Sequence, residues 1–236
     1  MKAFIAATVV ALAAVSPANA TLQISSLING TPFFCADGDA CDTNSSPGVL
    51  SIGTQTFGSV SLLGSLQLQQ IGGTNFLNTS SFQITNNGAA DASITVAVGG
   101  TDFLGPVAQF SASGSGTWQT AAGSEIRLQY YGDAANQQGA SDTTDTPGAL
   151  LADSGVLTAV GTTDSINFND AGAFVDVDQH SLTLLTTGTL VGGGSLVGRS
   201  QTIVTAQAVP EPASLALLGG ALLSTAVMLR RRRRRS

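Results

Sequence analysis

The chain has 236 residues, of which 43% are hydrophobic, 10% charged and 6% aromatic, a length that suits one folded domain of ordinary size between processed ends. Between residues 21 and 208, fourteen acidic side chains outnumber two basic ones, Arg127 and Arg199, so this middle part carries a formal charge of −12. A nucleic-acid-binding face needs clustered lysines and arginines, so this charge balance excludes DNA and RNA as partners.

The first twenty residues have the three parts of a secretory signal peptide. Lys2 supplies a positive charge, an apolar stretch runs over residues 3–15, and Ala18-Asn19-Ala20 forms an A-x-A cleavage site. The apolar stretch is short for a helix that must cross a bilayer, which needs roughly 20 residues. We therefore expect the chain to be exported and its mature form to begin at Thr21.

The two cysteines lie close together in an acidic segment. Cys35 and Cys41 are separated by five residues with a flexible Asp-Gly-Asp centre, and in an exported chain this spacing favours a small disulfide-closed loop. A zinc site would need more ligands than two sulfurs, so we expect no metal there. The carboxylates of Asp37, Asp39 and Asp42 offer calcium ligands as an alternative, but their spacing is not that of an EF-hand, and a solvated acidic loop is favoured.

Short segments that alternate apolar and polar residues indicate an all-β fold between residues 21 and 208. Segments 81–85 and 92–98 are separated by Asn86-Asn87-Gly88, and two alternating runs joined by such a turn predict a β-hairpin. Several short strands with Gly, Asn and Asp between them predict an antiparallel β-sandwich or jelly roll. The other alternating segments are 65–71, 125–131, 165–170, 173–179, 180–185 and 199–209.

Segment 125–131 indicates which residues should face the core. Ile126, Leu128 and Tyr130 fall on one side of a strand, and the polar residues between them fall on the other. The segment that follows, from Gly132 to Gly148, is polar and without periodicity, which predicts a long loop. We expect that loop to divide the sandwich into two halves.

Few residues in the middle of the chain suit catalysis. His180 is the one histidine, so a histidine-rich metal centre is excluded and a Ser-His-Asp arrangement has a single possible base. The G-x-S-x-G elbow, the P-loop and the complete G-x-G-x-x-G fingerprint are absent from the sequence. We therefore expect no enzymatic activity, no catalytic residue and no cofactor, with His180 an exposed polar residue at the start of a strand.

The sequence allows more than one role for two carboxylates, Asp176 and Asp178, and for the single tryptophan. Asp176 and Asp178 alternate with Val175 and Val177, so the two carboxylates should share one face of a strand. A solvated face is the interpretation we favour, although paired carboxylates also suit calcium binding or acid–base chemistry on a sugar. Trp118, the only tryptophan, is expected in the core, with stacking on a carbohydrate as the alternative.

An uncharged apolar segment and a basic tail close the sequence. Residues 213–229 would span about 25 Å as a helix, which is within the range that crosses a bilayer. The arginines that follow cannot easily cross with it, so they should stay in the cytoplasm and leave residues 21–208 outside. Pro210 and Pro212 disfavour helix and sheet, so the segment before the helix should be accessible to an enzyme. The stop-transfer residues are Arg230, Arg231, Arg232, Arg233, Arg234 and Arg235.

The order of motif, apolar helix and basic end resembles the PEP-CTERM sorting segment of exported Gram-negative bacterial proteins. The motif residues are Val209, Pro210, Glu211 and Pro212, and the apolar helix begins directly after them. The resemblance implies an exosortase-type processing enzyme as partner and an inner-membrane anchor before processing. It also implies a final place at the cell surface or in the extracellular matrix, with exopolysaccharide as a further partner.

The sequence thus predicts a signal peptide at 1–20, a β-sandwich ectodomain at 21–208 and a sorting segment at 209–236. We expect the ectodomain to be a structural surface or matrix protein associated with exopolysaccharide and biofilm. The alternative is a surface module that binds polysaccharide or calcium. A hydrolase that uses Asp176 or Asp178 ranks third.

Overall fold

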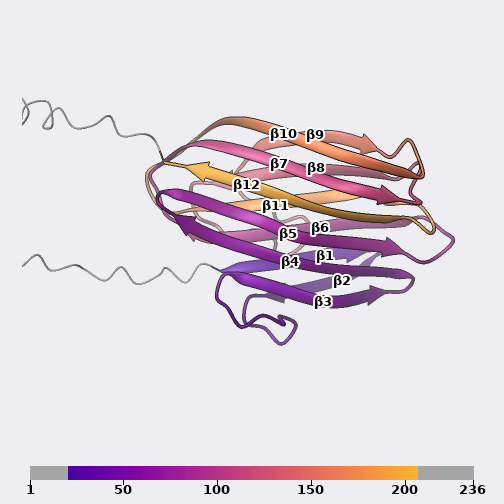
Figure 1. Ribbon diagram of the computed structural model, residues 1–236. Helices are drawn as coiled ribbons and strands as arrows, with labels where there is room; N and C mark the ends of the chain where they lie inside the picture. Colours follow the sequence, from indigo (N-terminus) through magenta and orange to yellow (C-terminus); the bar gives the residue numbers. More distant parts are fainter. Residues whose placement is uncertain (1–20, 207–236) are drawn as a thin grey trace, which may run out of the picture.

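The computed structural model describes residues 21–206, and this part of the chain folds entirely into strands, turns and loops (Figure 1). The predicted signal peptide and sorting segment lie outside the described residues. The all-β prediction is confirmed for residues 21–206. The strands are β1 (Leu22–Ile28), β2 (Thr31–Ala36), β3 (Val49–Phe57), β4 (Val60–Ile71), β5 (Thr74–Asn86), β6 (Ala92–Phe103), β7 (Val107–Gln119), β8 (Glu125–Asp133), β9 (Ala149–Thr158), β10 (Thr163–Asp176), β11 (His180–Leu190) and β12 (Ser195–Thr205).

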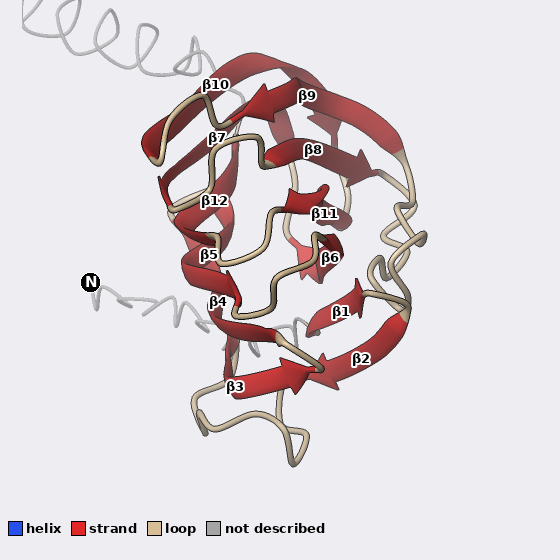
Figure 2. Cartoon of the chain, turned by 90° about the vertical axis from the view of Figure 1, so that its right-hand side faces the viewer, coloured by secondary structure: helices blue, strands red, loops and turns tan. Residues whose placement is uncertain are grey.

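The strands form two six-stranded antiparallel sheets packed face to face. Sheet A has the order β2-β1-β6-β11-β8-β9, and sheet B has the order β10-β7-β12-β5-β4-β3. Sheet B faces the viewer in Figure 1, and Figure 2 shows the two layers side by side, with β9 next to β10 at one end and β2 next to β3 at the other. The predicted antiparallel β-sandwich is therefore confirmed.

The core fills the space between the two sheets because alternate residues of each strand face inward. In β8, Ile126, Leu128 and Tyr130 are buried as the alternation predicts. Trp118 on β7 is also buried in this core, which confirms the interpretation that it packs inside the domain. Most strands bury one apolar face against the opposite sheet, and removal of these apolar groups from water drives the two layers together.

The predicted hairpin between segments 81–85 and 92–98 is wrong. β5 pairs with β4 and β12 in sheet B, whereas β6 pairs with β1 and β11 in sheet A. Buried Asn86 stabilises this crossover by donating from Nδ2 to the carbonyl oxygens of Ala90 at 2.7 Å and Leu190 at 3.1 Å. A turn reverses the chain locally, but it does not fix whether the next strand joins the same sheet or the facing one.

The predicted long loop exists as residues 134–148, but it does not divide the sandwich. It joins β8 to its neighbour β9 and folds over the outer face of sheet A. There Gln23 Nε2 donates to the carbonyl oxygen of Gly139 at 2.9 Å, and Asn136 Nδ2 donates to Asp102 Oδ1 at 2.8 Å. Gly99 allows this close approach, because a Cβ on it would overlap the Gly139 carbonyl, whose carbon would lie 2.6 Å away.

Candidate functional site

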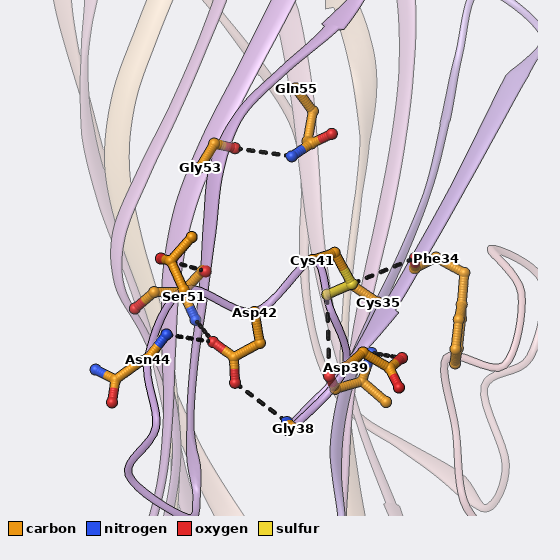
Figure 3. The surroundings of a disulfide bond; sticks show 12 residues. Phe34, Cys35, Gly38, Asp39, Cys41, Asp42, Asn44, Ser51, Gly53 and Gln55 are labelled. Carbon is orange, nitrogen blue, oxygen red and sulfur yellow. Dashed lines mark hydrogen bonds between the residues drawn. A yellow bond between two sulfur atoms is a disulfide. The ribbon is translucent and has the colours of Figure 1, made fainter.

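The predicted disulfide is confirmed at the end of β2. Cys35 and Cys41 are bonded with a Cα–Cα distance of 6.0 Å, within the usual range for a disulfide (Figure 3). Cys35 is fully buried and Cys41 is partly exposed, so the bond fastens the acidic loop to the edge of the core. Such a bond suits an oxidising compartment outside the cytoplasm.

The carboxylates around the disulfide organise the loop by accepting bonds from backbone N–H groups. Asp42 accepts from Ser51 and Asn44 at 2.9 Å and from Gly38 at 3.2 Å (Figure 3). Partial burial tends to raise the pKa of Asp42, but these hydrogen bonds outweigh it and the net shift is downward. Across residues 21–206, no three His, Cys, Asp or Glu side chains are grouped so that they could hold a metal ion.

The prediction that His180 is exposed is wrong, because its side chain is fully buried at the start of β11. Its ring stacks on Phe103 with a centroid distance of 5.7 Å and meets the edge of Phe174 at 5.4 Å. Nε2 lies 3.3 Å from Asn75 Nδ2, and Nδ1 lies 3.9 Å from Asp176 Oδ2. The two aromatic rings come from β6 and β10, so segments far apart in the chain create this environment.

The predicted solvated face of Asp176 and Asp178 is also wrong. Asp176 is buried beside His180, whereas Val175 and Val177 are 68% and 73% exposed. A register shift of β10 against β7 between Ala173 and Asp176 marks an irregularity in the ladder. The alternation of side chains nevertheless continues through it, because Asp176 falls on the same inward side as Ile166 and Phe174. Asp178 follows the strand and is exposed, so the two carboxylates do not form a pair on one face.

The burial of His180 predicts weaker folding in mild acid. Burial lowers its pKa below the usual 6.5, with the charge of Asp176 opposing part of that effect. The unfolded chain therefore takes up this proton before the folded chain does, and the free energy of unfolding should fall as the pH decreases below 6.5. Urea unfolding measured between pH 7.5 and 5 checks this expectation. In a His180→Gln variant, the unfolding free energy should lose most of its dependence on pH over this range. An equally steep dependence in the variant would contradict the assignment of the effect to His180.

A large groove lies on the outer face of sheet B. It has a volume of 740 Å³ and crosses β10, β7, β12 and β5. Small polar side chains line it because they occupy the outward positions of strands whose alternate residues face the core. We call it the serine groove; its lining includes Ser81, Ser113, Ser115, Ser165, Asn167 and Gln201.

Among residues 21–206, Arg199 on β12 is the one charged side chain that lines the serine groove. None of the described acidic residues lines the groove, and within residues 21–206 none forms an ion pair with Arg199. The other described arginine, Arg127, is paired with Asp153 through an Nε–Oδ1 hydrogen bond of 2.8 Å. A domain with a formal charge of −12 thus keeps one exposed, unpaired cation among hydroxyl and amide groups.

Tyr130 supports the floor of this groove from the opposite sheet. Its hydroxyl donates to the carbonyl oxygen of Ser113 at 2.9 Å and accepts from Ser200 Oγ at 2.8 Å. Burial raises the pKa of Tyr130 to about 12, although the hydrogen bond from Ser200 opposes this rise. The hydroxyl therefore stays protonated and links sheet A to β7 and β12.

Sequence reasoning did not single out Arg199 as a site residue. One signal was present, because Arg199 is one of two basic residues in a middle part with fourteen acidic ones. The serine groove itself had no sequence signal, since serines from β5, β7 and β10 become neighbours only through strand order. The predicted motif residues Val209 to Pro212, the cleavage residues Ala18 and Ala20, and the arginine tail lie outside the described residues.

By its fold, the part of the chain at residues 21–206 is an all-β sandwich domain with one disulfide. Residues 208–234 match the family model of the PEP-CTERM protein-sorting motif, so the chain carries this motif and the predicted resemblance is confirmed. β12 ends at Thr205, and the last strand therefore leads almost directly into the motif. No helix within residues 21–206 is long and apolar enough to cross a membrane.

Solved structures similar to this chain include carbohydrate-binding modules and an adhesin domain. TmCBM61 in complex with β-1,4-galactotriose has 10% identity and a TM-score of 0.33, with 63% of this chain and 90% of that chain covered. The CBM22-1 xylan-binding domain from Paenibacillus barcinonensis Xyn10C has 13% identity and a TM-score of 0.30, and the match covers 69% of this chain and 89% of that domain. The K3 adhesin domain of Lys-gingipain from Porphyromonas gingivalis has 8% identity and a TM-score of 0.31, and the match covers 56% of this chain and 74% of that domain. No curated protein sequence matches the chain.

Proposed function

We propose that this chain is an exported surface or matrix protein whose C-terminal segment is processed by an exosortase-type enzyme. The match of residues 208–234 to the PEP-CTERM sorting motif carries this proposal. The signal peptide at residues 1–20 supplies the export step, and cleavage after Ala20 leaves Thr21 immediately before β1. The disulfide between Cys35 and Cys41 is consistent with a domain that matures outside the cytoplasm.

The sorting segment would work through three consecutive parts. Residues 213–229 hold the chain in the inner membrane, and Arg230 to Arg235 stop translocation because each charge costs about 2.5–3.5 kcal/mol at the centre of a bilayer on insertion scales. Pro210 and Pro212 keep the motif free of regular secondary structure at the outer surface. The product is then transferred to the cell surface or matrix.

The sorting proposal predicts that the arginine tail is lost only when enzyme and motif are both intact. Mass spectrometry of the protein from cells with and without the enzyme follows the C-terminus, alongside a Glu211→Ala variant in the normal strain. Glu125→Ala is the matched control, because Glu125 is the only other glutamate and is exposed on β8. A tail that persists on the mature protein in every strain would show that the segment is an ordinary anchor.

We propose a structural rather than enzymatic role for the ectodomain. The one histidine, His180, is buried between Phe103 and Phe174 and does not reach the serine groove. Asp176 is buried beside it, so neither group is exposed to a polymeric substrate. Turnover of a polysaccharide that is lost on Asp176→Asn substitution would contradict this assignment.

A second candidate function is binding of acidic polysaccharide in the serine groove. The observation that favours it is the unpaired Arg199 in an acid-free groove lined by hydroxyl and amide groups. A guanidinium pairs with a carboxylate through two parallel hydrogen bonds, and hydroxyl groups suit the neighbouring sugar oxygens. An extended groove of 740 Å³ is large enough for several sugar units.

This candidate predicts that Arg199→Gln weakens binding of polygalacturonate by on the order of tenfold, since a charge-assisted hydrogen-bonded pair contributes about 1.5–3 kcal/mol. Arg127→Gln is the control that removes the same charge from a site on sheet A, and it should leave the affinity nearly unchanged. Titration calorimetry measures both. Equal losses in the two variants would indicate a non-specific effect of net charge.

A further inference from the structure

A second hollow, which we call the Phe34 pocket, lies on the outer face of sheet A at the edge formed by β1 and β2. It has a volume of 420 Å³. Its walls come from these two strands and from the loop 134–148 that folds over the sheet. The lining residues that matter here are Ser25, Leu27, Pro32, Phe34, Ser141 and Asp142. The pocket and the serine groove lie on the outer faces of different sheets.

Phe34 presents an exposed aromatic ring at this edge. Ser25 is opposite Phe34 and Leu27 is opposite Pro32 in the register of β1 and β2, so these four side chains share the outer face. The Phe34 side chain is 47% exposed, while the next residue, Cys35, is buried and held by the disulfide (Figure 3). The ring is therefore solvated, and its backbone is held in place by the strand and the neighbouring disulfide, which makes it a suitable platform for an apolar surface.

Ser25 supplies an unpartnered hydroxyl in the wall of the pocket. The residue is only 3% exposed, and its Oγ has no hydrogen-bond partner among residues 21–206. Buried hydroxyl groups are normally paired, because an unpaired one loses its hydrogen bonds to water without replacement. The atom is closed to solvent in the free domain, so a ligand that shifts the pocket wall slightly and brings a polar oxygen to Ser25 would restore this missing bond.

Asp142 supplies a charged acceptor in the loop that borders the pocket. Its Oδ1 accepts from the hydroxyl and the backbone N–H of Thr144, both at 2.7 Å, which orients the carboxylate. The hydrogen bond from the Thr144 hydroxyl, and after it the bond from the Thr144 backbone N–H, hold the pKa of Asp142 below its usual value. The Asp142 side chain is exposed, so its carboxylate can also accept from a ligand hydroxyl.

We propose that the Phe34 pocket binds a neutral hexose unit of a polysaccharide. The flat C–H face of the sugar ring packs on Phe34, the Asp142 carboxylate accepts from a sugar hydroxyl, and Ser25 Oγ bonds to a sugar oxygen. The charge of Asp142 disfavours uronic acids in this pocket. This specificity is opposite to that of the serine groove, where Arg199 favours an acidic sugar.

The test measures binding of neutral β-1,4-linked gluco-, galacto- and manno-hexasaccharides to the full-length chain, in a detergent without sugar headgroups. Phe34→Ala should weaken binding of the preferred neutral sugar by about tenfold through loss of buried apolar area. Leu150→Ala is the control, because Leu150 is 49% exposed on β9 at the opposite edge of sheet A. It should leave binding unchanged, and polygalacturonate should not compete for the pocket.

Ser25→Ala separates a binding role from a structural one. Because the hydroxyl has no partner in the folded domain, its removal should leave the melting temperature unchanged or raise it. Binding of the neutral hexasaccharide should nevertheless weaken by about threefold or more. The proposal is overturned if no neutral hexasaccharide binds at millimolar concentration, or if binding survives Phe34→Ala and Ser25→Ala. It is equally overturned if neutral-sugar binding is lost in Arg199→Gln instead.

Discussion

Replacing Gly99 with alanine is expected to lower the free energy of unfolding by about 3 kcal/mol or more, because the new Cβ has no space. It would overlap the carbonyl of Gly139, with the carbonyl carbon 2.6 Å away and Gln138 Nε2 3.0 Å away. Backbone cannot yield as a flexible side chain can, so either β6 or the loop 134–148 must move. We expect the loop to detach, since a bond from Gln23 and a small set of other contacts hold it to the sheet.

Two measurements check the Gly99 prediction. Urea unfolding gives the loss of stability, and an Asp-specific protease reports release of the loop by faster cleavage next to Asp142 or Asp145. Gly53→Ala on β3 is the matched control, because its Cβ would have Thr43 Cγ2 as nearest neighbour at 3.9 Å. Gly53→Ala should change stability by less than about 1 kcal/mol. Similar behaviour of both variants would mean that the loop does not depend on this close approach.

Replacing Trp118 with alanine is expected to cost about 3–5 kcal/mol of unfolding free energy, as for other fully buried large aromatic residues. Trp118 is the largest of the fully buried side chains and faces the core from β7. Its loss leaves a cavity next to Leu196, which lies opposite it on β12. Such a loss of stability would show that Trp118 contributes to the core, and it would argue against a role for Trp118 in stacking on a carbohydrate.

The Trp118 prediction is measured by denaturant unfolding of the variant and of a surface control. Val160→Ala is suitable because Val160 is exposed in the turn between β9 and β10, and its change should stay within about 0.5 kcal/mol. A Trp118→Ala variant as stable as the control would contradict the core assignment. Loss of polysaccharide binding without loss of stability would favour the stacking alternative.

Some properties of this protein are determined by residues close together in the sequence. The alternation in β8 defines its buried face, because side chains of a strand point to opposite sides with a period of two. Cys35 and Cys41 pair because the six-residue separation already brings them within reach. The sorting motif is contiguous, so the match at residues 208–234 needs no tertiary structure. The sorting motif and the all-β class were therefore accessible from sequence, whereas export through the signal peptide stays a prediction.

Other properties were decided only by the pairing of strands that are distant in the chain. The segments on either side of Asn86 each need one buried face, and packing them in facing sheets satisfies that need as well as a hairpin does. His180 is buried because Phe103 and Phe174 arrive from other strands, and Asp176 lies on the same inward face of β10 as Phe174. Arg199 gains its acid-free groove in the same way, since strand order brings β10, β7, β12 and β5 together. Local periodicity fixes which residues share a face of one strand, whereas the surroundings of that face depend on non-local contacts.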